Sequence, residues 1–362
     1  MDMAGRTWRR TAWAALAIAC WVAPAPAQTS EDDTINTIRE LGAISGADQR
    51  RINDWVLAQV GQLTESARKD ANAAFVQFRD RFQKQYAHAK NSQAFRAQLA
   101  AQTAQVAADW LSKRDLQPTV GWALVAAISA MEEPEVLPAL ISGLKSTIET
   151  VRFLSAKSLA GQKLRDAIAN DAGKFAEVMG ALQAAGVVES SSVVLSRIYE
   201  GLAYPTKAST VLPAYQAIFD ARLSARRRPM TASDGAEFWA YEFFRTPAVM
   251  NSLTAEQKNQ LVQRLATFLR ADAERYNAPN LQPNANHNEI VSLELSLDAV
   301  EEVLTTLAGA GKGGKIREQL ARGGIAQKAE VLKEAYKWVG DPQSKEPGAL
   351  NAAPWDVPLG AP

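Results

Sequence analysis

A glycine-rich run at residues 309–315 has the spacing of a phosphate-binding loop. It reads Gly-Ala-Gly-Lys-Gly-Gly-Lys, so a Gly-Lys pair follows the first glycine at the required distance. In nucleotide-binding proteins such a loop follows a strand and is followed directly by Ser or Thr, whose hydroxyl binds the metal. Here a helical pattern precedes the run and Ile316 follows it. We therefore interpret the run as a flexible connection between two helices, with no cofactor bound.

The chain has two histidines, His88 and His287, which are 199 residues apart, and one cysteine, Cys20. A zinc site needs three or four clustered Cys, His or carboxylate ligands, and the sequence holds no such cluster. Neither histidine is accompanied by the G-x-S-x-G motif that presents a nucleophilic serine. We therefore expect both histidines on the surface, and we predict no catalytic residue and no metal ligand.

Adjacent glutamates occur at 132–133 and at 301–302. Neighbouring side chains on a helix point about 100° apart, so neither pair is a ready-made acid and base. An exported helical enzyme that acts on polysaccharide would need two carboxylates brought together from distant loops. The long loop at 277–288 contains no acidic residue. We therefore predict a non-enzymatic protein and keep the polysaccharide enzyme as an alternative.

The densest aromatic cluster lies at 237–245. Trp239 and Phe243 are four residues apart and share one face of a helix, while Tyr241 and Phe244 line another. Core packing explains such a cluster. It is also suited to serve as a platform for a carbohydrate or a peptide, since aromatic residues are enriched at binding sites. We therefore take Trp239, Tyr241, Phe243 and Phe244 as candidate partner-binding residues.

These residues belong to a helical pattern that repeats. Apolar residues recur at helical spacing over 134–145 and over 148–160, and both patterns return 42 or 43 residues later. The matched pairs are Val136 with Val178, Leu137 with Met179, Leu140 with Leu182, Val151 with Val194, Leu159 with Leu202 and Ala160 with Ala203. A period of about 40–47 residues with two helices per repeat is typical of stacked helical repeats. An irregular helical bundle is the alternative.

The run Val-Arg-x-x-Ser-Ala-x-x-Leu-Ala-Gly at 151–161 resembles the second helix of a HEAT repeat. The resemblance to the HEAT/armadillo class covers about 118–204 and implies an irregular α-solenoid of stacked antiparallel helix pairs. In that family an arginine stands near the start of the second helix, as Arg152 does here. The next repeat has Leu195 at the matching position, and Val-Leu-Pro-Ala recurs at 211–214 out of register.

The pattern divides the chain into four parts. Residues 1–27 are a signal peptide, 28–116 an N-terminal helical segment, 117–340 the HEAT-like repeat domain and 341–362 a Pro- and Gly-rich tail that we expect to be disordered. Between 65 and 115 there is neither Pro nor Gly. We expect one long helix there, or two that join near 90–92, forming a long N-terminal helical hairpin.

The first 27 residues have the features of a secretory signal. Three arginines, at positions 6, 9 and 10, precede an apolar stretch over 11–23 that is short for a membrane span. The Ala-Pro-Ala motif at 25–27 predicts cleavage after Ala27. We therefore expect a periplasmic or secreted protein. The alternatives are a retained anchor helix, or a lipoprotein attached through Cys20, whose preceding residues faintly resemble a lipobox.

Charge gives no sign of a polyanionic partner. The formal net charge is +1, and removal of the signal leaves −1. A near-neutral chain lacks the basic footprint of nucleic-acid binding, and we expect no transmembrane segment in the mature chain. The Arg-Arg-Arg run at 226–228 ends a predicted helix, where it suits the helix dipole. We therefore predict an exported scaffold that binds a protein or peptide. A lipid-anchored structural protein of the envelope is a further alternative.

Overall fold

The computed structural model describes residues 35–226, 235–281, 286–309, 311–323 and 326–359. These residues form helices joined by turns, and no strand occurs among them beyond an isolated bridge between Asp341 and Glu346. The prediction of an all-α fold is therefore confirmed. No helix in the described ranges is both long and apolar enough to cross a membrane. The predicted signal peptide and Cys20 lie outside these ranges.

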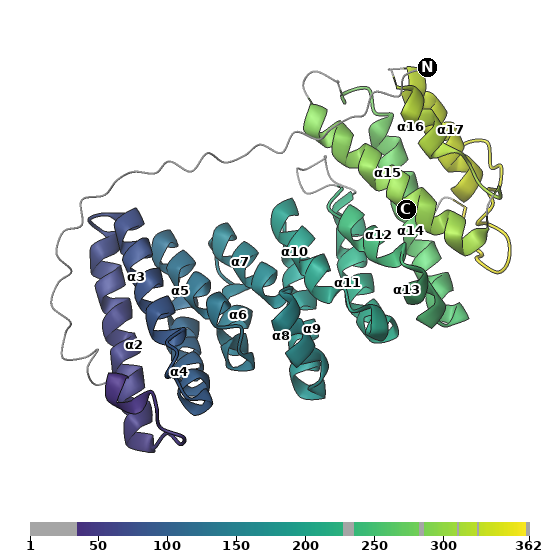
Figure 1. The fold of residues 1–362 in the computed structure, drawn as a ribbon. Helices are drawn as coiled ribbons and strands as arrows, with labels where there is room; N and C mark the ends of the chain where they lie inside the picture. Colours follow the sequence, from purple (N-terminus) through teal and green to yellow (C-terminus); the bar gives the residue numbers. More distant parts are fainter. Residues whose placement is uncertain (1–34, 227–234, 282–285, 310, 324–325, 360–362) are drawn as a thin grey trace, which may run out of the picture.

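Figure 1 shows the helices side by side in a curved array, with α16 and α17 at one end. Their bounds are α2 (Gly46–Ala67), α3 (Ala71–Tyr86), α4 (Gln93–Leu111), α5 (Pro118–Met131), η1 (Pro134–Val136), α6 (Leu137–Gly143), α7 (Glu149–Leu159), α8 (Gln162–Ala169), α9 (Ala172–Val188), α10 (Ser192–Leu202), η2 (Pro205–Lys207), α11 (Ala208–Arg226), α12 (Phe238–Phe244), α13 (Pro247–Ser252), α14 (Ala255–Tyr276), α15 (His287–Ala308), α16 (Ile316–Arg322) and α17 (Ala326–Val339).

Side-chain caps set the ends of the N-terminal helices. Asp70 accepts a hydrogen bond from the backbone N–H of Ala73 and begins α3, and Ser92 accepts from that of Phe95 and begins α4. The stretch 65–115 is therefore broken twice. The break near 90–92 was expected, and the one at 68–70 was not, because it contains neither Pro nor Gly. Helices α2 and α3 pack together, and α4 packs on α2.

The helices contact one another in two rows. We call α3, α5, α7, α10, α12 and α15 the inner row, and α2, α4, α6, α9, α11, α14 and α17 the outer row. Each helix packs against the next member of its own row. Members of one row also pack on the other, as α2 does on α3, α6 on α7 and α14 on α15. In Figure 1 the inner row lies on the upper, concave side of the array.

One connected apolar core runs through the array, from Ile35 to Val357. Residue 116 marks no break in it, since α4 packs on both α5 and α6. Small residues allow some close approaches. A Cβ atom at Gly186 in α9 would lie 2.5 Å from Ile218 of α11, so only glycine fits there without a shift.

A buried ionic cluster joins α11, α12 and α14. Arg226 donates from Nη2 to Glu237 at 2.8 Å and from Nε to Asp272 at 2.9 Å, and Arg222 donates to Glu237 at 2.7 Å. Burial raises the pKa of Asp272. For Glu237 burial acts in the same direction, but the charges of Arg226 and Arg222 outweigh it and lower the pKa. Arg226 stands in the last turn of α11, as the dipole role requires, and it also joins this buried cluster, which the sequence did not predict; residues 227 and 228 lie outside the described ranges.

The predicted disordered tail is folded over residues 341–359. The backbone N–H groups of Ala349 and Leu350 donate to carbonyls at the end of α17, at 2.8 and 2.9 Å, and the side chains of Leu350 and Val357 are buried. Asn259 of α14 donates to the carbonyl of Pro354 at 2.9 Å. The Pro- and Gly-rich composition therefore reflects turns that return to the array, and the prediction of disorder was wrong.

Candidate functional site

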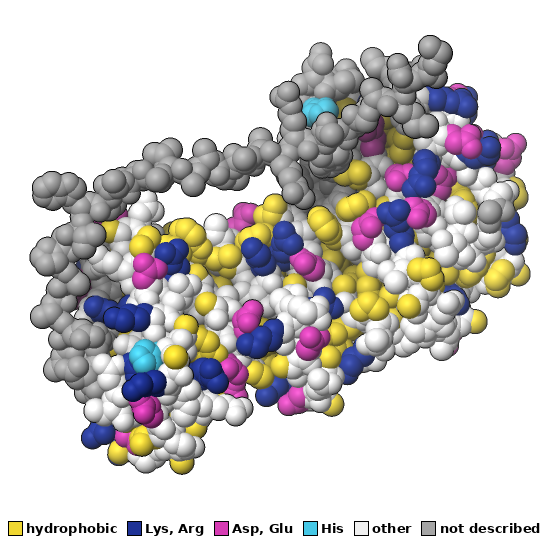
Figure 2. All heavy atoms as spheres, viewed as in Figure 1, with side chains coloured by type: hydrophobic (Ala, Val, Ile, Leu, Met, Phe, Trp, Pro, Cys, Tyr) yellow, Lys and Arg dark blue, Asp and Glu magenta, His cyan; other side chains and the backbone are white. Residues whose placement is uncertain are grey.

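Exposed apolar side chains occur on five of the six helices of the inner row, and a few others, such as Leu57 and Val188, lie on the outer row. The exposed fraction is 41% for Trp122, 51% for Val193, 48% for Trp239 and 48% for Leu295. We call this surface the inner face. Its apolar and aromatic members are Phe75 and Val76 on α3, Trp122 on α5, Phe153 on α7, Val193 on α10, Trp239 on α12, and Val291 and Leu295 on α15. Figure 2 shows hydrophobic side chains mixed with charged ones along the upper side of the array.

Contacts between neighbouring helices hold the aromatic rings of the inner face in place. The rings of Phe75 and Trp122 stack with centroids 4.2 Å apart, and the guanidinium of Arg79 lies 5.8 Å from the Phe75 ring. Further along, the guanidinium of Arg197 lies 5.6 Å from the ring of Phe153. Cation–π contacts and stacking fix rings that are open to solvent on one side. The inner face is therefore partly ordered before any partner binds.

A small cavity opens between α5 and α7 on the inner face. Its volume is about 240 Å³, and apolar side chains from five helical elements line it. Ser129 and Ser158 lie in it and form a hydrogen bond with each other across the two helices. The lining residues are Ala126, Ser129, Glu132, Val136, Leu140, Leu154, Lys157, Ser158, Gly161 and Leu164.

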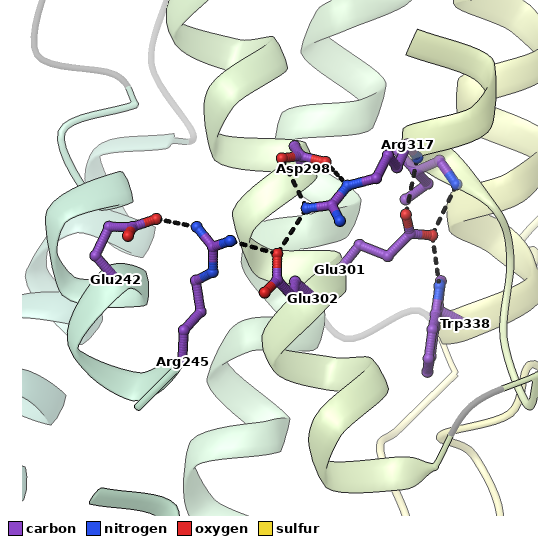
Figure 3. A network of polar contacts seen from close by, with 8 residues as sticks. Glu242, Arg245, Asp298, Glu301, Glu302, Arg317 and Trp338 are labelled. Carbon is purple, nitrogen blue, oxygen red and sulfur yellow. Dashed lines mark hydrogen bonds and ion pairs between the residues drawn. The ribbon is translucent and has the colours of Figure 1, made fainter. Parts of the chain in front are cut away.

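The C-terminal end of the inner face carries an ionic network, shown in Figure 3. Arg245 of α12 donates to Glu302 of α15 at 2.6 Å and also pairs with Glu242. Arg317 donates to the same Glu302 oxygen at 2.6 Å and pairs with Asp298. Partial burial alone would raise the pKa of Glu302, but the hydrogen bonds from Arg317 and Arg245 lower it. The network therefore fixes α12, α15 and α16 relative to one another.

Glu301 points the opposite way from Glu302, into the interior (Figure 3). It accepts hydrogen bonds from the backbone N–H groups of Ile316 and Arg317, at 2.7 and 2.8 Å, and from Nε1 of Trp338 at 3.3 Å. Burial raises the pKa of Glu301 despite these three donors. The two adjacent carboxylates therefore belong to separate networks, one that caps α16 and one on the surface.

The structure separates the four candidate aromatic residues. Trp239 is exposed on the inner face, whereas Tyr241, Phe243 and Phe244 are buried. Phe243 stacks on Tyr215 of α11 with centroids 5.2 Å apart, and the other two pack on rings of α11 and α14. The short helix α12 buries most of its circumference between its neighbours. As partner-binding candidates, the three buried residues are therefore corrected to core residues.

The glycine-rich run at 309–315 is a packed connection, apart from residue 310, which is not described. A Cβ atom on Gly313 would lie 2.0 Å from the Trp338 ring, and one on Gly314 would lie 2.0 Å from the carbonyl oxygen of Glu334. The N–H of Lys315 donates to the Glu334 carboxylate at 2.8 Å. These glycines allow α16 to approach α17, so the expectation of a flexible linker was wrong for 313–315.

The two histidines lie in different parts of the array. His88 is half-buried in a turn after α3, and His287 is exposed at the start of α15. Among the residues that the structure describes, no group of three or more His, Cys, Asp or Glu side chains is placed to hold a metal ion.

Comparison with known proteins gives no relative: no family model, no curated protein and no solved structure matches this chain. The inner face is therefore interpreted from its own residues.

Proposed function

We propose that this chain is an exported, non-enzymatic helical-repeat scaffold whose inner face binds a protein or peptide partner. The observation that carries the proposal is the line of exposed apolar and aromatic side chains along the inner row. Soluble proteins rarely leave a long apolar surface uncovered, and such surfaces commonly mark interaction sites. Tryptophan, which the inner face presents at positions 122 and 239, is enriched among the residues that dominate binding energy.

The two rows of helices support an α-solenoid of the HEAT/armadillo kind. Such a fold stacks helix pairs so that each contacts only its neighbours, and its concave surface is the usual binding surface. Arg152 lies in the first turn of α7, as in the HEAT helix that this segment resembles, and donates to Glu189 at 2.7 and 3.0 Å. This pair links the connection after α9 to α7 and so joins successive helix pairs.

Export follows from the predicted signal peptide. Mass spectrometry of the mature protein tests it directly. A chain that begins at Gln28 supports a secreted or periplasmic scaffold. A chain that begins at a lipid-modified Cys20 supports the lipid-anchored alternative, in which the same inner face would act at the membrane surface.

Co-purification from a native envelope extract tests the binding function. We compare the natural chain with Trp122→Ser/Trp239→Ser and with Leu57→Ser, a control on the outer row whose side chain is 46% exposed. We expect the inner-face variant to lose a specific partner that the control retains. If all three chains recover the same proteins equally, the inner face does not bind the partner.

A further inference from the structure

The cavity between α5 and α7 has the size and the lining of a side-chain pocket. At about 240 Å³ it is smaller than the 300–1,000 Å³ that is usual for small-molecule sites. Its floor contains Val136, Leu140 and Leu164, which offer no charge to a ligand. One of the hydroxyls of Ser129 and Ser158 donates to the other, which in turn donates to a carbonyl of its own helix, so both hydroxyls have a partner. An aliphatic group can therefore enter without leaving a buried polar atom unpaired.

Two charged side chains line this cavity, Lys157 and Glu132. Lys157 is exposed and forms no ion pair with any described residue. Glu132 is paired with Lys163 at 3.4 Å, so Lys157 is the charge of the lining that has no ion partner. The ammonium of Lys157 therefore favours an acidic partner.

We propose that this cavity anchors one aliphatic side chain of a partner peptide, with an acidic residue next to it that pairs with Lys157. This inference rests on the proposed function of the inner face and names the chemistry of what binds there. The aliphatic side chain displaces water from the apolar floor, and the carboxylate lies at the rim. Trp122 on one side and the Phe153 and Arg197 pair on the other provide the neighbouring contacts.

Phage selection of random heptapeptides on the full-length mature chain tests this inference. We expect enrichment of peptides in which Leu, Ile or Met stands next to Asp or Glu. The enriched peptide is then synthesised and its affinity measured by fluorescence anisotropy. Ala126→Phe, which fills the cavity from α5, should weaken binding by about tenfold or more. Lys157→Glu should weaken it by about three- to tenfold at low salt, because it reverses the charge at the rim.

Two matched variants serve as controls. Ala184→Phe adds the same ring at an exposed position of α9 in the outer row, and Lys145→Glu reverses an exposed charge elsewhere. Both should bind within about twofold of the natural chain. The inference is overturned if the selected peptides lack an aliphatic residue next to an acidic one. It is also overturned if Ala126→Phe and Lys157→Glu leave peptide affinity unchanged. If Ala126→Phe instead abolishes a dimer seen by light scattering, the occupant is a second copy and the inference is also wrong.

The same measurements separate this inference from the proposed function. Suppose that Trp122→Ser/Trp239→Ser loses peptide binding and Ala126→Phe does not. The inner face is then the binding surface, and the cavity is not part of the peptide site.

Discussion

The rings of Phe75 and Trp122 stack across α3 and α5, with their centroids 4.2 Å and their planes 11° apart. Trp122 is nevertheless 41% exposed, so one side of the pair faces solvent. An aromatic pair that is held in place and left uncovered is suited to bind a partner at low entropic cost. This pair begins the line of apolar groups that we assign to binding.

Replacing Trp122 should separate binding from stability. In Trp122→Ser we expect the free energy of unfolding to fall by about 1 kcal/mol, mostly from loss of the stacked pair. Partner affinity should fall by about tenfold or more, as for other interface tryptophans. Urea unfolding and a binding assay on the same preparation check both values. A loss of stability of several kcal/mol would instead show that Trp122 belongs to the core.

Removing Arg226 should destabilise the fold strongly. Arg226→Met leaves the carboxylates of Glu237 and Asp272 buried without their shared partner, which costs about 3–5 kcal/mol. Arg264→Met is the matched control, because Arg264 pairs with the exposed Asp220, and an exposed pair contributes about 0–1 kcal/mol. Chemical denaturation of both variants measures the difference. Equal losses would mean that the buried cluster adds nothing beyond a surface ion pair.

Glu189 should make the stability of the array depend on pH. Burial alone would raise the pKa of Glu189, but Arg152 and the N–H groups of Ser190 and Ser191 lower it. Because its pKa is lower in the folded chain, the stabilisation is complete above the unfolded pKa of about 4.3 and is lost as the pH falls through the folded value. Glu189→Gln should cost about 2–4 kcal/mol at neutral pH.

The two chains should therefore converge in stability as the medium becomes acidic. Urea unfolding from neutral pH down to about pH 3 follows this convergence. A difference that stays constant over the whole range would show that the carboxylate is not the source of the stabilisation.

Gly314 should tolerate no side chain. In Gly314→Ala the new Cβ atom meets the backbone oxygen of Glu334, which cannot rotate away, and we expect a loss of about 2–3 kcal/mol. Gly61 in α2 has no atom within 4 Å of the corresponding position, so Gly61→Ala should stabilise by about 0.5–1 kcal/mol. Thermal unfolding of the pair checks both signs. A neutral Gly314→Ala would support the flexible loop predicted from the sequence.

The folded C-terminal segment should contribute to stability. Leu350 is fully buried, so Leu350→Ala should cost about 2–4 kcal/mol. Leu359→Ala, at a side chain that is 41% exposed, should change stability by less than about 0.5 kcal/mol. Denaturant unfolding measures both. If Leu350→Ala is as neutral as the control, residues 341–359 do not pack on α17 in solution.

Local sequence patterns predicted that the chain is helical, but they did not predict which faces of the helices are buried. The Thr254-x-x-Gln257 motif predicts a capping box, and the structure contains it at the start of α14. The same kind of reading failed for Tyr241 and Phe244, because rings of α11 and α14, distant in sequence, decide which side of α12 is buried. The sequence does not reveal such partners when no related sequence is at hand.

The exposure of the inner-face side chains was likewise not predictable from the sequence. Trp122 lies in the apolar helix α5, and its exposure depends on α3 and α7, which flank α5 in the inner row. Likewise, Arg226 meets Asp272 only because α11 packs on α14, 46 residues further along the chain. Periodicity predicts which residues share a helix face. It does not say which faces a neighbouring helix covers.

Site-specific photocrosslinking decides whether the inner face holds a partner in its native setting. A photoreactive phenylalanine analogue is placed at Trp122, at Trp239 and, as an outer-row control, at Leu57, and intact cells are irradiated. We predict that the first two positions yield the same crosslinked protein and that Leu57 does not. Crosslinking of that protein from Leu57 alone, or equally from all three positions, would contradict binding through the inner face.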